Sequence, residues 1–142
     1  MNYLNLFLDY LKAEQNLARN SIDAYRRDIT KYLEYLKTQN IEILDVTHNI
    51  INEYLWHRKQ QNISARSLAR FSVSIKMFHK FLMAENITKL DPTRNLVLPK
   101  IPQTLPEYLT NEEVELFLAQ PKNLRDKTLL ELFYSTGMRI SE

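Results

Sequence analysis

A single glycine, Gly137, is present in this chain of 142 residues. Average usage would supply about ten glycines in a chain of this length, so the one that is present marks a backbone position that other residues fill poorly. It follows a segment in which apolar residues recur at helical spacing, and no alternating segment is long enough to indicate a strand. Scarce glycine and helical periodicity together predict an all-α protein.

Four amphipathic helices are expected before residue 90. The second should begin at Asn20 or Ser21, since either side chain can cap a helix. Thr47 and Ser64 should precede the third and fourth. The apolar stripes of the four helices are Leu4, Phe7, Leu8 and Leu11; Ile22, Tyr25, Ile29, Tyr32, Leu33 and Leu36; Ile50, Ile51, Tyr54 and Leu55; and Leu68, Phe71, Ile75, Phe78 and Leu82. Their spacing predicts one helical domain over residues 1–90.

Prolines interrupt the helical pattern over residues 91–109. Each proline lacks a backbone donor and disfavours helix immediately before it. The four prolines of this segment are Pro92, Pro99, Pro102 and Pro106. They predict an extended linker between two domains.

A second unit is expected over residues 110–142. Thr110 and Glu113 have the spacing of a capping box at the start of a helix. A further helix should run over residues 124–135, and Gly137 is well placed to end it in the left-handed conformation. Two helices and the start of a third bury little core by themselves, so we expect this unit to be a truncated domain.

The composition argues against several classes of protein. The chain has no cysteine, and its three histidines are too scattered to suggest a ligand cluster, so we expect no metal and no cofactor. No apolar run approaches the length of a membrane span, and the first residues lack the features of a signal peptide. We therefore expect a cytoplasmic protein with no membrane partner.

Charge is distributed unevenly along the chain. Residues 1–90 hold thirteen Lys and Arg against nine Asp and Glu, whereas residues 91–142 hold six against eight. This asymmetry is compatible with a polyanion partner for the first part and equally with ordinary solvated helix faces.

The expected fourth helix has a polar face that is purely cationic between residues 64 and 80. Arg66 and Arg70 are one helical turn apart on it, and Ser67 and Ser74 add hydroxyl groups. Such a face suits a DNA groove, where arginine contacts phosphates and guanine edges, although a solvated basic face remains the alternative. The second helix carries Arg19, Arg26, Arg27 and Lys31, but Asp23 and Asp28 lie among them and can pair along the helix.

Arg139 stands apart from these basic helices. It lies two residues after the glycine that should end a helix. Its permanent charge and fixed fork of donors suit a phosphate or carboxylate, and could stabilise charge on a phosphoryl group. A structural or surface arginine is the alternative for an isolated Thr-Gly-x-Arg.

The last nine residues, YSTGMRISE, closely resemble the box around the first catalytic arginine of tyrosine recombinases, particularly those of the Xer type. Three upstream stretches resemble other landmarks of this family in the same order. Asn16–Asp28 is similar to the start of the second helix of its N-terminal core-binding domain, residues 91–110 to its interdomain linker, and Leu124–Lys127 to its next helix.

This resemblance implies a four-helix, SAM-like core-binding domain that clamps DNA together with a catalytic domain. The second and fourth helices of that domain would enter the major groove of double-stranded DNA. The residues implied as DNA contacts are Ser21, Arg26, Arg66, Ser67 and Arg70. Arg139 matches the family arginine that grips the scissile phosphate.

The family reaction is DNA strand exchange, as in chromosome dimer resolution, by a tetramer of recombinase subunits. A tyrosine attacks the phosphate and stores the bond as a 3′-phosphotyrosyl link. None of the eight tyrosines of this chain matches that nucleophile. The resemblance therefore implies a fragment that binds DNA without cutting it, while the parent is an enzyme.

Two alternatives remain open from the sequence. One is a fragment of a phage or transposon integrase rather than a Xer recombinase. The other is a complete small helical protein, a non-catalytic remnant that binds DNA or another protein.

Overall fold

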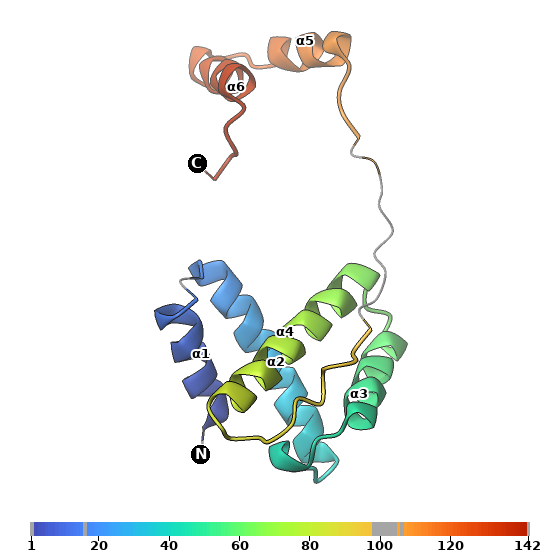
Figure 1. Cartoon of the computed structure of the whole chain (residues 1–142). Helices are drawn as coiled ribbons and strands as arrows, with labels where there is room; N and C mark the ends of the chain where they lie inside the picture. Colours follow the sequence, from blue (N-terminus) through green and yellow to red (C-terminus); the bar gives the residue numbers. More distant parts are fainter. Residues whose placement is uncertain (1, 16, 98–104, 106, 142) are drawn as a thin grey trace. The chain divides into compact units, whose positions relative to one another are not determined.

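The computed structural model describes residues 2–15, 17–97, 105 and 107–141, and within these residues all regular structure is helical. The all-α prediction is confirmed. The elements are α1 (Tyr3–Ala13), α2 (Arg19–Thr38), the short 3-10 helix η1 (Ile43–Asp45), α3 (His48–Gln60), α4 (Ala65–Ala84), α5 (Asn111–Ala119) and α6 (Leu124–Thr136). They form two compact units, Met1–Pro102 and Gln103–Glu142, which Figure 1 shows in colours that follow the sequence.

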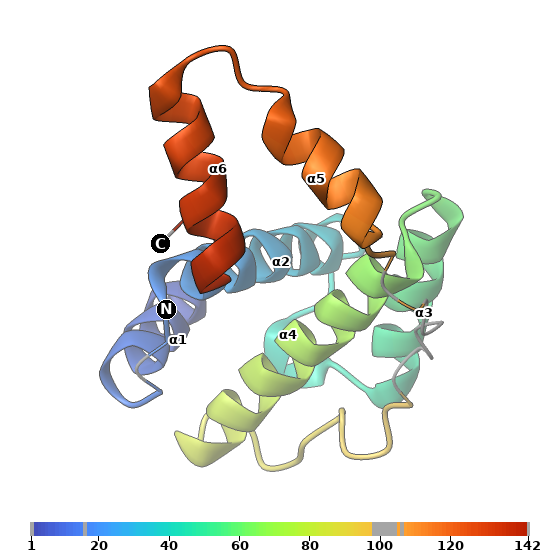
Figure 2. The same ribbon diagram turned by 90° about the horizontal axis from the view of Figure 1, so that it is seen from above.

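The first unit is built around the contact between α2 and α4. Helix α1 packs on α2, and α3 packs on α4, so that apolar stripes from all four helices meet in one core. Aromatic rings fill its centre, and Phe7 meets Phe78 edge to face with ring centroids 5.2 Å apart. Each large apolar side chain buried here contributes about 1.5–3 kcal/mol. The predicted stripes therefore form the core, which holds α2 and α4 against each other (Figure 2).

In the first unit, two of the three predicted helix caps are confirmed. The Thr47 and Ser64 side chains accept from backbone N–H groups at the starts of α3 and α4. The start predicted for α2 at Asn20 or Ser21 is wrong, because the helix begins at Arg19 after Ala18 and has no side-chain cap. The Ala18 carbonyl instead accepts from the Ser21 N–H at 2.9 Å and so closes the first turn.

Asparagine replaces glycine at the ends of the first unit's helices. Asn40, Asn62 and Asn86 have φ of 55°, 54° and 56°, and each lies two residues past the end of α2, α3 or α4. Asparagine tolerates this left-handed conformation better than other residues with a Cβ atom. Three helix exits are thereby made without glycine, which explains how the chain folds with only one.

The segment after α4 returns to the first unit. Thr93 and Leu96 are buried, and Leu96 belongs to the hydrophobic core. Asp91 Oδ1 accepts from the backbone N–H and the hydroxyl of Thr93, at 2.8 and 2.6 Å, which forms a tight turn. The remaining prolines predicted to make the linker, Pro99, Pro102 and Pro106, lie outside the described residues. The domain boundaries at residues 90 and 109 stay predictions.

The second unit contains α5 and α6. The capping box of Thr110 and Glu113 is confirmed, with the Thr110 N–H donating to Glu113 Oε2 at 2.8 Å. Gly137 ends α6 at φ 65° and donates its N–H to the Phe133 carbonyl at 2.9 Å, as predicted. No described residue of either helix is buried.

Candidate nucleic-acid interface

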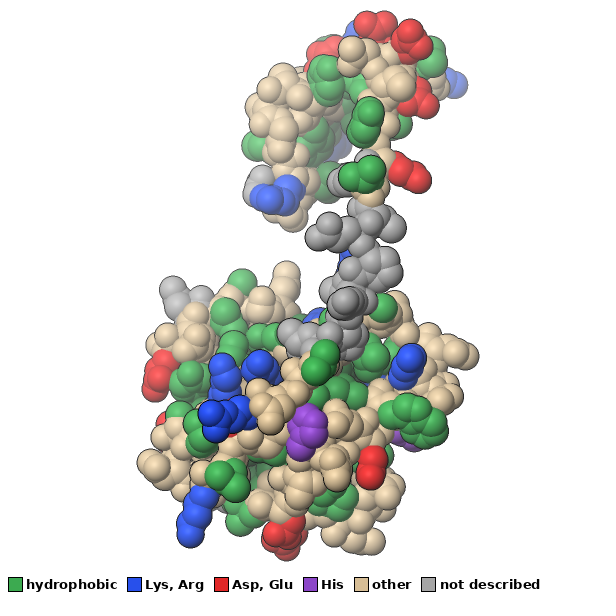
Figure 3. Space-filling view, turned by 45° about the vertical axis from the view of Figure 1, so that its right-hand side comes forward, with side chains coloured by type: hydrophobic (Ala, Val, Ile, Leu, Met, Phe, Trp, Pro, Cys, Tyr) green, Lys and Arg blue, Asp and Glu red, His purple; other side chains and the backbone are tan. Residues whose placement is uncertain are grey.

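The cationic residues of α4 begin in its first turns. Arg66 is exposed, and within the described part of the chain it makes no ion pair within 4 Å. Ser67 is half-buried, and its hydroxyl accepts from that of the capping residue Ser64 at 3.0 Å. Figure 3 shows Lys and Arg side chains gathered on one face of the first unit. Arg66 is therefore a cation available to a polyanion.

Arg70 differs from Arg66 because it is paired with a buried carboxylate of α2. Its Nη2 atom lies 3.0 Å from Asp28 Oδ1, and Ser74 donates its hydroxyl to Asp28 Oδ2 at 2.8 Å. Asp28 is only 1% exposed, whereas the Arg70 side chain is 44% exposed. The guanidinium carbon of Arg70 also lies 5.4 Å from the centre of the Phe71 ring. We call Asp28, Arg70 and Ser74 the interhelix triad.

The triad changes two expectations from the sequence. Asp28 pairs with a residue of another helix rather than along α2, and Ser74 is a buried partner of Asp28 rather than an exposed donor. The cationic face of α4 thus meets an acidic group from α2. A signal for this was present, because Asp28 lies three residues after Tyr25 and four before Tyr32, on the apolar stripe of α2.

Burial raises the pKa of the Asp28 carboxyl above its ordinary value. The hydrogen bond from Ser74 and the charges of Arg70, Arg27 and Lys31 act in the opposite direction. Three cations from two helices therefore lie close enough to influence one buried acid. Asp28 is buried, whereas Arg27, Lys31 and Arg70 are exposed, so the surface around Asp28 carries the positive charges.

The α2 residues implied as DNA contacts are Ser21 and Arg26. Both are exposed, and Ser21 lies in the first turn of α2. Arg27 and Lys31 are also exposed on this helix. Because α2 and α4 pack directly on each other, cations from both belong to one unit of fixed geometry.

Arg139 lies in the other unit, two residues beyond the left-handed Gly137, and is exposed. The hydroxyl of Thr136 donates to the Leu132 carbonyl at 2.6 Å and accepts from the Met138 N–H at 3.4 Å. These bonds order the chain at the end of α6. The conformation at the end of α6 therefore sets the position of the Arg139 backbone within the second unit.

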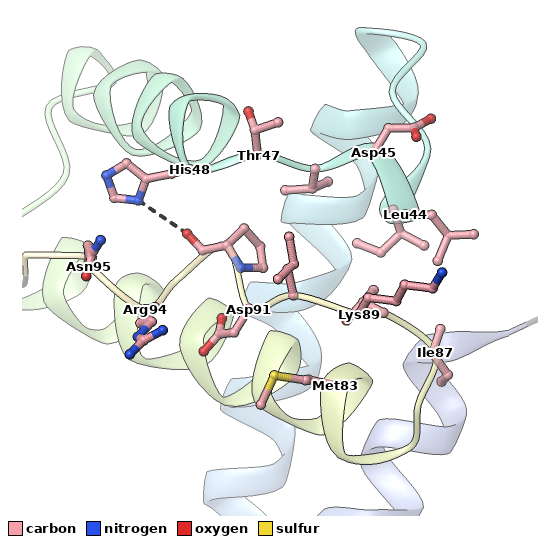
Figure 4. Close-up of a pocket in the computed structure, with 15 residues that line it drawn as sticks. Leu44, Asp45, Thr47, His48, Met83, Ile87, Lys89, Asp91, Arg94 and Asn95 are labelled. Atoms are coloured by element: carbon pink, nitrogen blue, oxygen red, sulfur yellow. Dashed lines mark hydrogen bonds between the residues drawn. The ribbon is translucent and has the colours of Figure 1, made fainter.

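A groove of about 990 Å³ lies at the opposite end of α4 (Figure 4). Met83 and Leu44 are among its apolar lining residues. The Nδ1 atom of His48 lies 3.2 Å from the Pro92 carbonyl oxygen, and a dashed line marks this hydrogen bond in Figure 4. Met83 is roughly 25 Å along the helix from Arg66, at 1.5 Å per residue. The groove is thus separate from the cationic start of α4.

Other kinds of site have little support among the residues that the structure describes. No group of three or more His, Cys, Asp or Glu side chains is arranged to hold a metal ion there. No helix in the described ranges is both long and apolar enough to cross a bilayer. The cationic surface of α2 and α4 is the feature best suited to a ligand.

The helical architecture and the family match define the class of protein. The family model described as phage integrase, N-terminal SAM-like domain, matches residues 4–86, which is more than half of the chain. The chain belongs to this family.

Similarity to individual proteins extends beyond the matched domain. Tyrosine recombinase XerD of Halalkalibacterium halodurans is 39% identical over 148 residues, covering 99% of this chain and 50% of the relative. XerD of Staphylococcus epidermidis is 41% identical over 96% of this chain and 48% of the relative. XerD of Shewanella oneidensis is 33% identical over 98% and 48%. The resemblance to Xer-type tyrosine recombinases is confirmed, and the chain spans about half the length of these relatives.

Proposed function

We propose that this chain is the DNA-binding N-terminal part of a site-specific tyrosine recombinase of the Xer type. Residues 1–90 bind double-stranded DNA, with α4 as the principal element and α2 beside it. The contact residues are Ser21, Arg26, Arg66, Ser67 and Arg70. The XerD relatives are named as recombinases of this class, which supports DNA as the ligand.

The observation that carries the proposal is the exposed Arg66 at the start of α4. It has no ion pair among the described residues, and no acidic residue lies between positions 64 and 80. An unpaired arginine on an exposed helix face gains more from a DNA phosphate than one already neutralised by a carboxylate.

In the complete recombinase, Arg139 contributes to the site that grips the scissile phosphate. Its permanent charge and planar donors would stabilise the phosphoryl group while a tyrosine forms the phosphotyrosyl link. The active assembly is a tetramer of recombinase subunits on paired DNA sites, and the cytoplasm is the compartment where it acts. No metal and no small-molecule cofactor are required for this exchange of phosphodiester bonds.

The test of DNA binding uses Arg66→Ala in the full 142-residue chain and a 30-base-pair duplex. Loss of one phosphate contact should lower the slope of log affinity against log salt by about 0.9 and weaken binding at low salt. Fluorescence anisotropy at five salt concentrations measures both. Lys59→Ala, which removes an exposed cation from α3, is the matched control and should leave both values unchanged.

Equal affinities and slopes for wild type and Arg66→Ala would contradict the assignment of this surface. Arg70→Ala is less suitable for the test, because it would leave the carboxylate of Asp28 buried without its counter-charge. A buried charge that loses its partner destabilises a fold, so any loss of binding could arise from unfolding.

A further inference from the structure

The interhelix triad divides the two arginines of the α4 face into different electrostatic classes. Arg66 carries an uncompensated charge, whereas the charge of Arg70 is balanced by Asp28 at 3.0 Å. A balanced pair attracts phosphate weakly and releases few counterions when DNA approaches. If Arg70 contacts DNA, electrostatic attraction is therefore a minor part of its contribution.

The same pair restricts the orientation of Arg70, whereas Arg66 has no ion pair among the described residues to restrict it. One nitrogen of the Arg70 guanidinium faces Asp28, the group packs near the Phe71 ring, and the carboxylate is held by Ser74. Asp28 is 1% exposed, so it cannot turn away into solvent, while 44% of the Arg70 side chain stays accessible. An exposed arginine whose guanidinium is already paired with a buried carboxylate loses little conformational freedom when it binds a ligand.

These properties match the requirements of base recognition. Arginine reads guanine by donating to O6 and N7 in the major groove, and this contact depends on orientation more than on net charge. Phosphate contacts, by contrast, set affinity without carrying sequence information. Restricted orientation with balanced charge favours a base contact for Arg70, and an uncompensated charge favours a phosphate contact for Arg66.

We propose that Asp28 is a positioning residue for sequence recognition: through the interhelix triad it presents Arg70 to a guanine edge in the major groove. The inference rests on the proposed DNA-binding function and assigns different roles to the two arginines of α4. Arg70 supplies base preference, Arg66 supplies attraction to phosphate, and the α2–α4 contact joins the two. Asp28 does not touch DNA.

This role predicts that Asp28→Asn raises non-specific affinity and its salt dependence but lowers base preference. The asparagine keeps the shape of the side chain and can still accept from Ser74, but it releases the charge of Arg70. Non-specific affinity should rise, and the salt slope should steepen by about 0.9. Preference for guanine at one position should fall roughly 5- to 150-fold, because the arginine is no longer held in place. Loss of the carboxylate charge raises non-specific affinity by itself, so the fall in guanine preference is the result that distinguishes a positioning role from a purely structural one.

The experiment starts from a library of random-sequence duplexes, because the target site is unidentified. The full chain is used to select bound duplexes, and the selected sequence is then compared with a scrambled one for wild type and Asp28→Asn. Ser72→Ala is the matched control, since it removes a buried hydroxyl of α4 that donates to the Leu68 carbonyl at 3.0 Å and leaves all three residues of the interhelix triad in place. It should keep the base preference and the salt slope of wild type.

A second measurement changes the DNA and already tests the inference with the wild-type protein. Replacing the preferred guanine by 7-deazaguanine removes the N7 acceptor, and wild type should lose at least fivefold in affinity, whereas Asp28→Asn should lose less than twofold. Both variants are checked for helical content by circular dichroism. The deazaguanine result stands even if Asp28→Asn proves unstable.

The outcomes separate this inference from the proposed function. Wild type that binds the library without enriching a guanine position, or that is indifferent to 7-deazaguanine, overturns the role of Asp28 and Arg70 while DNA binding stands. An unchanged salt slope and base preference in folded Asp28→Asn overturns it as well. A wild-type chain that binds no duplex at low salt overturns both.

Discussion

His79 should make the first unit sensitive to mild acid. The side chain is fully buried, and its Nε2 atom lies 2.9 Å from the Tyr32 hydroxyl oxygen. Burial lowers the pKa of His79 from 6.5 to about 4, while the charge of Asp91 acts in the opposite direction. The unfolded chain therefore binds a proton between pH 6.5 and 4 that the native state resists.

The sign and size of the effect follow from this difference in pKa. The contribution of neutral His79 to the free energy of unfolding is present above pH 6.5. It is lost as the pH falls from 6.5 towards 4, because protonation of the imidazole favours the unfolded state. A difference of about 2.5 pKa units corresponds to about 3 kcal/mol, of which about 2 kcal/mol is lost by pH 5. This is a large part of the 5–15 kcal/mol that is typical of a small domain.

Urea unfolding at pH 7.5 and pH 5.0 measures the loss. Near-ultraviolet circular dichroism of the buried Tyr32 and Tyr54 follows the loss of packing in the first unit. The expected result is that wild type loses about 2 kcal/mol more than His79→Gln, whose amide can still bond to Tyr32 but does not titrate. The raised pKa of Asp28 acts with the opposite sign in both proteins and cancels in the comparison.

His57→Gln is the matched control, because it removes an exposed imidazole from α3. It should lose as much free energy as wild type on going to pH 5.0. If His79→Gln also loses as much as wild type, protonation of His79 does not cause the loss of stability, whatever the absolute stability of the variant.

Two further predictions concern the exit of the chain from each unit. Leu96→Ala should lower the free energy of unfolding of the first unit by about 2–5 kcal/mol, whereas Val97→Ala at the neighbouring, 86% exposed position should change it by less than about 0.5 kcal/mol in the same urea assay. Gly137→Ala should weaken the last turn of α6 by about 1–2 kcal/mol, because alanine is strained at a φ of 65°. No neighbouring atom would contact the added Cβ, so the backbone conformation is the only source of this cost, and Gly137→Asn should cost less. Amide hydrogen exchange at residue 137 measures both, and an alanine variant as well protected as the asparagine variant would refute this explanation.

Much of the helical architecture was predictable because it depends on interactions within a few residues. The caps at Thr47 and Ser64, the capping box at Thr110 and the left-handed Gly137 all involve side chains and backbone groups three or four positions apart. The start of α2 was less predictable, since Ala18 offers no cap and the helix is selected by the packing of its apolar stripe.

The candidate interface was predictable only in part. The exposure of Arg66 follows from its place opposite the apolar stripe of α4, which periodicity indicates. The pairing of Arg70 with Asp28 could not be inferred, because the two helices had to be docked before their polar residues met. The place of Asp28 on the apolar stripe of α2 is a signal of burial that the pairing expected along the helix overlooked, and spacing alone does not identify the partner.

Local pattern by itself determined the class of fold, the starts of α3, α4 and α5, and the position of the glycine at the end of α6. Helix propensity, periodicity and capping act over a few residues and are therefore written in the sequence. The tertiary structure alone decided which buried polar groups satisfy one another. Asp28 with Ser74 and Tyr32 with His79 are 46 and 47 residues apart, so these contacts exist only once α2 packs on α4. Burial makes an unpaired polar group costly, and the docked helices bring the partners within bonding distance.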